Sequence, residues 1–191
     1  GVNVLDKHVV STYVRNPLVM FSLSLFFTCT TILILWFTGL VEEVSWNLGL
    51  LGIGGGGLYM VAGIFYFSAI QKDDISRIAP LFHVVPLFTA LLAALFLGEL
   101  FTGKTYAGIG TIVLGAILLS PKAAGRRITP NASFWLMVLC AVLVAMGNIA
   151  TKYVLDAAGY WTALFYMYAG QTIALVPIVV KAYPDIRLVA R

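Results

Sequence analysis

Residues 17–40 read PLVMFSLSLFFTCTTILILWFTGL, an apolar run in which no charged side chain occurs. The hydrocarbon core of a bilayer is about 30 Å thick, so a helix needs roughly 20 apolar residues to cross it. Lipid offers the backbone no hydrogen-bond partners, so a spanning segment is either a helix or a strand of a closed barrel. The run is continuous and not alternating, which favours a helix. The stretch therefore predicts a membrane-spanning helix.

Five more apolar runs of similar length follow, and short polar loops separate them. They are residues 46–70, 78–98, 104–121, 133–155 and 160–182. Residues 1–13 resemble the last turns of an earlier span, and we expect the chain to be part of a longer protein. Short loops make neighbouring helices antiparallel. The predicted fold class is all-α, a polytopic membrane helix bundle in the inner or plasma membrane of the cell.

Composition agrees with a membrane protein and excludes other classes. Of 191 residues, 61% are hydrophobic and 10% are charged, whereas soluble domains average about a quarter charged. Such a chain is neither disordered nor an ordinary soluble domain. The net charge of +4 is too small for a nucleic-acid binder, and the basic residues do not form one stripe. The bilayer is the expected partner, and nucleic acid is not.

A weak internal repeat appears when the chain is shifted by 145 residues. NVLDKHVV at 3–10 then falls on NIATKYVL at 148–155, and each copy ends a span. The identities are Asn3 with Asn148, Lys7 with Lys152, and Val9 with Val154. Five spans separate the copies, and an odd number turns the second copy upside down in the bilayer. Inverted repeats that enclose a site are a common plan of transporters.

The run at 78–98 contains two prolines and a histidine. Pro80 and Pro86 donate no backbone hydrogen bond, so the carbonyls of Ser76 and Phe82 lose their helical partners. Within a membrane such carbonyls need another partner or a wet cavity. His83 lies between the prolines, and an ionisable side chain at membrane depth indicates a site. The alternative is a neutral histidine bonded to a neighbouring helix.

Two polar pairs share a helical spacing of four residues, so each pair lies on one helix face. They are Asn3 with Lys7 and Asn148 with Lys152. One interpretation is that each lysine snorkels to the lipid headgroups. The other is a cation that faces the bundle interior and binds an anionic group or a coupling proton.

Glycines at positions 49, 52, 56 and 63 form one stripe along the run at 46–70. Each glycine costs a helix about 1 kcal/mol relative to alanine in water. Close approach of another helix offsets that cost in lipid. The alternative interpretation is a surface on which a moving helix slides or bends.

Residues 66–120 resemble the second half of an EamA domain of the drug/metabolite transporter superfamily. The shared marks are the alanine that ends the second full span, the polar DDISRIAP turn, the proline-centred run, the LGE that follows it, and the spaced glycines of 104–121. Members commonly have ten helices in two inverted five-helix repeats. The resemblance implies a first repeat at 1–121, an inter-repeat loop at 122–132 and the start of a second repeat at 133–191.

The resemblance also implies a secondary active transporter, a permease or exporter of small metabolites or drugs that works by alternating access. The implied small-molecule substrate is unidentified, protons are a candidate coupling ion, self-association into a homo-oligomer is left open, and no cofactor is implied. The substrate-binding residues that it implies are Lys7, Tyr59, Pro80, His83, Asn148 and Lys152.

Two other functional classes compete with this interpretation, and the charge pattern gives a separate prediction of orientation. An intramembrane enzyme is disfavoured because the sequence has no H-E-x-x-H or G-x-S-x-G motif. A membrane scaffold that transports nothing is the second alternative, and it predicts a dry bundle without a polar cavity. The positive-inside rule places the more basic loops in the cytoplasm, whereas the resemblance implies the opposite orientation.

Overall fold

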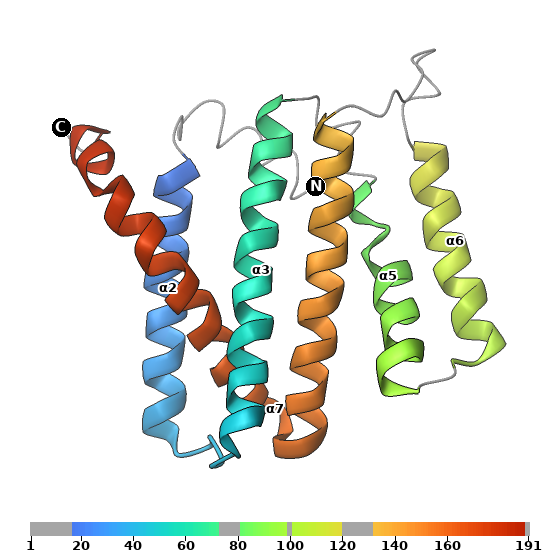
Figure 1. The fold of residues 1–191 in the computed structure, drawn as a ribbon, viewed down its shortest axis with the longest axis horizontal. Helices are drawn as coiled ribbons and strands as arrows, with labels where there is room; N and C mark the ends of the chain where they lie inside the picture. The colour runs from blue at the N-terminus through green and yellow to red at the C-terminus, as the bar shows by residue number, and fades with distance from the viewer. Residues whose placement is uncertain (1–16, 73–80, 99–100, 120–131, 190–191) are drawn as a thin grey trace. The chain divides into compact units, whose positions relative to one another are not determined.

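The computed structural model describes residues 17–72, 81–98, 101–119 and 132–189. Within these ranges every regular element is a helix, and no strand occurs (Figure 1). The elements are α2 (Pro17–Thr38), α3 (Trp46–Lys72), α5 (Val85–Leu92), the π-helix η2 (Ala93–Leu97), α6 (Gly103–Leu119) and α7 (Ala132–Val189). The predicted all-helical fold class is confirmed.

Three helices of the described chain are long and apolar enough to cross a membrane: α2, α3 and α7. The last one is two helices in sequence, because Gly159 interrupts it with φ 77° and ψ 176°. Only glycine adopts that conformation without strain, so the chain ends one helix and begins the next within a single residue. The separate runs predicted at 133–155 and 160–182 correspond to these two helices.

The chain divides into two compact units, and both α3 and α7 contribute to each. The first unit contains the described residues between 61 and 149, and the second contains those of 17–60 and 150–189. The two units are described separately below.

In the second unit, α3 and the second helix of α7 cross in direct backbone contact. A methyl group on Gly56 would meet the carbonyl oxygen of Met167, and one on Gly170 would meet the carbonyl oxygen of Ile53. The two contacts are reciprocal, so each helix presents its glycine to the backbone of the other. This packing matches the small-residue interfaces by which helices associate in lipid. It supports the packing interpretation of the glycine stripe.

The same unit contains a polar contact between α2 and α7. Thr172 Oγ1 donates a hydrogen bond to Thr28 Oγ1 over 3.0 Å. Thr28 Oγ1 also donates to the carbonyl oxygen of Leu25 in its own helix, at 3.1 Å. Because lipid provides no other partner, the pairing satisfies both hydroxyl groups.

In the first unit, a small core joins α3, the start of the next span and α7. Ala69, Ile70 and Met137 are almost completely buried there. The partly buried residues packed against them are Tyr66, Leu81, Phe82 and Leu136. This core therefore holds Leu81 and Phe82 of the proline-containing span against α3 and α7.

Large apolar side chains remain exposed along the helices, as a lipid environment requires. On α2, Phe26, Phe27, Trp36 and Phe37 are all more than half exposed. A soluble monomer rarely exposes such contiguous apolar surface. The exposure agrees with a polytopic membrane bundle.

Replacing Gly56 or Gly170 by alanine tests the backbone contact. We expect Gly56→Ala and Gly170→Ala each to lower the free energy of unfolding by about 1–3 kcal/mol, because the added methyl overpacks the crossing. The measurement is thermal unfolding of the protein in detergent micelles. Gly54 is the matched control, since a methyl there meets nothing within 4 Å. Gly54→Ala should be neutral or slightly stabilising, and equal destabilisation at positions 54 and 56 would contradict the contact.

Candidate substrate-binding site

The proline-containing span is a broken helix. Leu81 and Phe82 are helical, His83 and Val84 form a turn, and α5 begins at Val85. The N–H of Val84 donates to the carbonyl oxygen of Leu81 over 3.2 Å. The interruption separates the single run predicted at 78–98 into two segments.

Pro86 lies in the first turn of α5. A missing N–H is tolerated there because the first turn of a helix has no acceptor for its donors. The next two amides, of Leu87 and Phe88, both donate to the carbonyl oxygen of Val84, at 3.0 and 3.3 Å. The sequence predicted that Pro86 interrupts the hydrogen-bond ladder, and the new helix begins at that point.

Two side-chain contacts hold the chain on either side of the turn. Before it, the rings of Phe82 and Tyr66 pack edge to face, with their centroids 5.7 Å apart. After it, Asn148 Nδ2 donates a hydrogen bond to Thr89 Oγ1 over 3.1 Å. The turn therefore lies between two contacts, an aromatic contact to α3 before it and a hydrogen bond to α7 after it.

The far end of the same span is irregular as well. Its last turn is the π-helix η2, after which Gly98 takes a left-handed conformation with φ 65°. The N–H of Gly98 donates to the carbonyl oxygen of Ala93 and closes the wide turn. π-Helical turns occur frequently at functional sites. This span thus departs from regular α-helix at both ends of α5.

The predicted site residues of the first unit are His83 and Asn148. His83 is exposed in the turn, and Asn148 is half-buried and bonded to Thr89. Lys7 and Pro80 lie outside the described residues. The other two predicted site residues, Tyr59 and Lys152, belong to the second unit, where both are half-buried.

Thr151 adds a polar group beside Lys152 on α7. Its hydroxyl oxygen is buried and has no hydrogen-bond partner among the described residues. Burying such a group without a partner costs about 1–3 kcal/mol by protein mutational data. Other hydroxyls on the described helices donate to a carbonyl of their own helix, as Thr30, Thr111 and Ser68 do. Among the described residues, the Thr151 hydroxyl therefore stays buried and unpaired.

Thr89, Tyr66 and Phe82 were not predicted from the sequence as parts of a site. Thr89 could have been found, because it is the one hydroxyl within the apolar run that follows His83. Tyr66 and Phe82 carry no comparable signal, since aromatic residues are common throughout the chain.

A polytopic helical bundle in which a spanning helix is interrupted and polar side chains meet near the break is typical of membrane transporters. Residues 3–120 match the EamA-like transporter family, and the chain belongs to that family. It is therefore a multi-pass membrane protein of the drug/metabolite transporter type.

Two curated relatives illustrate this membership. The chain is 34% identical over 99 residues to a protein of Streptantibioticus cattleyicolor named "Probable terminal-alkyne amino-acid exporter", a match that covers 51% of this chain and 32% of the relative. It is 29% identical over 123 residues to the pseudopaline exporter CntI of Pseudomonas aeruginosa, covering 64% and 42%. The chain thus spans about a third to two fifths of the length of these relatives. No solved structure matches it significantly.

The Thr89–Asn148 hydrogen bond can be measured by a double-mutant cycle. We expect Thr89→Val and Asn148→Ala to be coupled by about 0.6 kcal/mol, and by no more than about 1.7 kcal/mol, the range found for such bonds in membrane proteins. The measurement is unfolding of each variant in detergent. Thr111 is the control, because its hydroxyl donates within its own helix, to the carbonyl oxygen of Ala107. Coupling between Thr111→Val and Asn148→Ala as large as that of Thr89→Val would contradict the assignment.

Proposed function

We propose that this protein is a secondary active exporter of small metabolites that works by alternating access. Membership of the EamA-like transporter family over residues 3–120 carries the proposal. The two exporter-named relatives support it. The energy source would be a proton gradient or the gradient of the substrate itself, because the sequence has no Walker A motif for ATP.

We further propose that two oppositely oriented repeats enclose the transport pathway. The sequence copies at 3–10 and 148–155 differ by 145 positions. The hydrogen-bonded Thr28 and Thr172 differ by 144 positions, almost the same offset. In an inverted repeat, positions that correspond and lie near the pseudo-two-fold axis face each other. The threonine pair is the contact expected where α2 crosses its counterpart, the second helix of α7.

The broken span is proposed as the part of the first repeat that contacts substrate. Interrupted helices at membrane depth are tolerated where they are buried in protein or line a water-filled cavity. His83, exposed in the turn, is the titratable group at this break. Asn148 fixes α5 on the far side of the turn through Thr89 and is proposed as a positioning residue.

Lys152 is proposed as the cationic contact for an anionic substrate group. It is half-buried on an apolar helix and directly follows Thr151 in the sequence, whose hydroxyl is buried. Amino acids are the first substrate class to test, because one relative is named as an exporter of a terminal-alkyne amino acid. Their carboxylate matches a lysine. Tyr59, on α3, is proposed to line the same pathway.

Export from cells tests the proposal directly. The intact protein is expressed in bacteria loaded with labelled amino acids, and the rate of release is measured with and without a protonophore. We expect Lys152→Ala to lower the rate about tenfold or more, since a hydrogen bond to a charged group is worth about 1.5–3 kcal/mol. His83→Ala should also slow export.

Lys104→Ala is the matched control, because Lys104 is exposed in the first turn of α6. It should export at the wild-type rate. If Lys152→Ala and His83→Ala both leave export unchanged, the site assignment is wrong. If the inserted protein releases no small metabolite of any class, the membrane-scaffold alternative replaces the exporter.

A further inference from the structure

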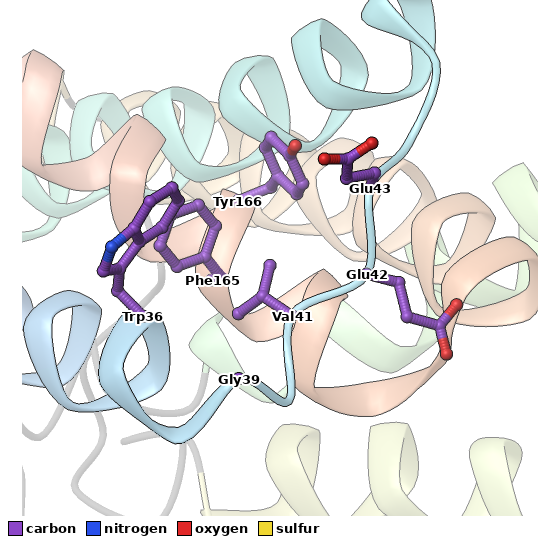
Figure 2. A pocket seen from close by; sticks show the side chains of 7 residues that line it. All are labelled: Trp36, Gly39, Val41, Glu42, Glu43, Phe165 and Tyr166. Atoms are coloured by element: carbon purple, nitrogen blue, oxygen red, sulfur yellow. The ribbon is translucent and has the colours of Figure 1, made fainter.

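A concave site lies in the second unit, at the end of α2. It is a cavity of about 260 Å³ (Figure 2). Its walls come from the last turn of α2, the connection to α3 and the second helix of α7. The lining residues are Trp36, Gly39, Val41, Glu42, Glu43, Phe165 and Tyr166. None of the residues proposed above for the transport pathway belongs to it.

Three aromatic rings form one side of the cavity. The rings of Trp36 and Phe165 pack with their centroids 6.1 Å apart and their planes tilted by 31°. Phe165 and Tyr166 are edge to face, with centroids 5.4 Å apart. The three rings come from two different helices, so the packing of α2 against α7 holds them together.

The connection between α2 and α3 is fixed against the same helix. Thr162, which is only 1% exposed, accepts a hydrogen bond at its Oγ1 from the N–H of Glu42 over 3.0 Å. Gly39, with φ 65°, turns the chain out of α2 toward this contact. The two glutamates are therefore carried by a backbone that a buried hydroxyl holds in place.

The charge of the cavity is negative. Figure 2 shows the carboxylate of Glu43 on the side of Tyr166, whereas that of Glu42 points away from the rings. No basic side chain is among the seven lining residues. The lining therefore disfavours an anionic ligand. A neutral ligand would form no ion pair with the carboxylate.

A metal ion does not suit the lining. Ca²⁺ takes six to eight oxygen ligands, and Mg²⁺ requires an octahedral set. The described residues contain no group of three or more His, Cys, Asp or Glu side chains that could hold a metal. Aromatic faces beside a carboxylate instead match an organic cation, which is attracted by the negative ring faces and paired by the carboxylate.

We propose that this cavity binds the ammonium group of a small organic cation or of a lipid headgroup. Pockets for drug-sized ligands measure about 300–1,000 Å³, so the cavity suits a single ammonium head and not a whole drug-sized molecule. Glu43 is the counter-ion, and Trp36, Phe165 and Tyr166 provide the aromatic faces. The inference stands apart from the transport proposal, because it concerns binding at residues that play no part in that proposal.

Choline is the probe, and the fluorescence of Trp36 is the readout. The intact protein is placed in phosphatidylglycerol nanodiscs, whose lipid carries no ammonium group, and titrated with choline chloride. The same titration on Trp36→Phe removes the background from the other three tryptophans. We expect a saturable Trp36 signal for choline and none for 3,3-dimethylbutan-1-ol, its neutral analogue. Equal signals from the two probes would overturn the proposal.

Charge variants assign the counter-ion. We expect Glu43→Gln to weaken choline binding by about 1.5-fold to fivefold, the range for a solvent-accessible ion pair. Glu42→Gln should weaken it less, since its carboxylate points away from the rings. Asp156→Asn, a charge removal at another exposed position of the same unit, should leave the affinity unchanged. Unchanged affinity in Glu43→Gln, with its melting temperature kept, would overturn the assignment.

A second lipid composition identifies the source of the ammonium group. Nanodiscs that contain phosphatidylethanolamine present a primary ammonium at the membrane surface. Weaker choline binding in those discs than in phosphatidylglycerol would support a lipid headgroup as the occupant. The same choline affinity in both would support a soluble cation.

Discussion

The backbone of a membrane-embedded chain must find its hydrogen-bond partners within the protein, and this constraint governs the structure. It makes every described element a helix. The same constraint applies to the break at His83 and Val84. A helix interrupted within the membrane is tolerated only where the protein around it satisfies the freed backbone groups. Within the turn the amides of Leu87 and Phe88 donate to the carbonyl oxygen of Val84. The side chains on either side are held by neighbouring helices, with Phe82 packed on Tyr66 and Thr89 bonded to Asn148. Contacts to two neighbouring helices therefore hold the broken segment on both sides of its turn.

Helix association in lipid has no hydrophobic driving force between helices, so close packing and polar contacts must supply it. The second unit uses both. Gly56 and Gly170 bring two backbones into contact, and Thr28 and Thr172 pair their hydroxyls across another crossing. The same arrangement brings Trp36 against Phe165 and so forms the wall of the acidic cavity. Packing and the second candidate site therefore depend on the same contacts between α2, α3 and α7.

Much of the fold follows from the sequence, because apolar runs of membrane length separated by short loops leave few alternatives. The helix bounds agree closely with the runs, and Gly159 falls between the two runs that α7 joins. The sequence also indicated a break near Pro86 and a packing role for Gly56. It could not identify Thr89 as the partner of Asn148, or Phe165 and Tyr166 as the wall beside Glu43. Those pairings join residues far apart in the chain, and no local periodicity encodes them.

The central claim is that the break at His83 faces water, although it interrupts an apolar run. Cysteine labelling tests it most directly, in a background in which Cys29 and Cys140 are replaced. The account predicts that His83→Cys reacts with a membrane-impermeant maleimide. Leu95→Cys, which is 69% exposed in the same span, should be protected by lipid. A His83→Cys variant as unreactive as Leu95→Cys would contradict the account.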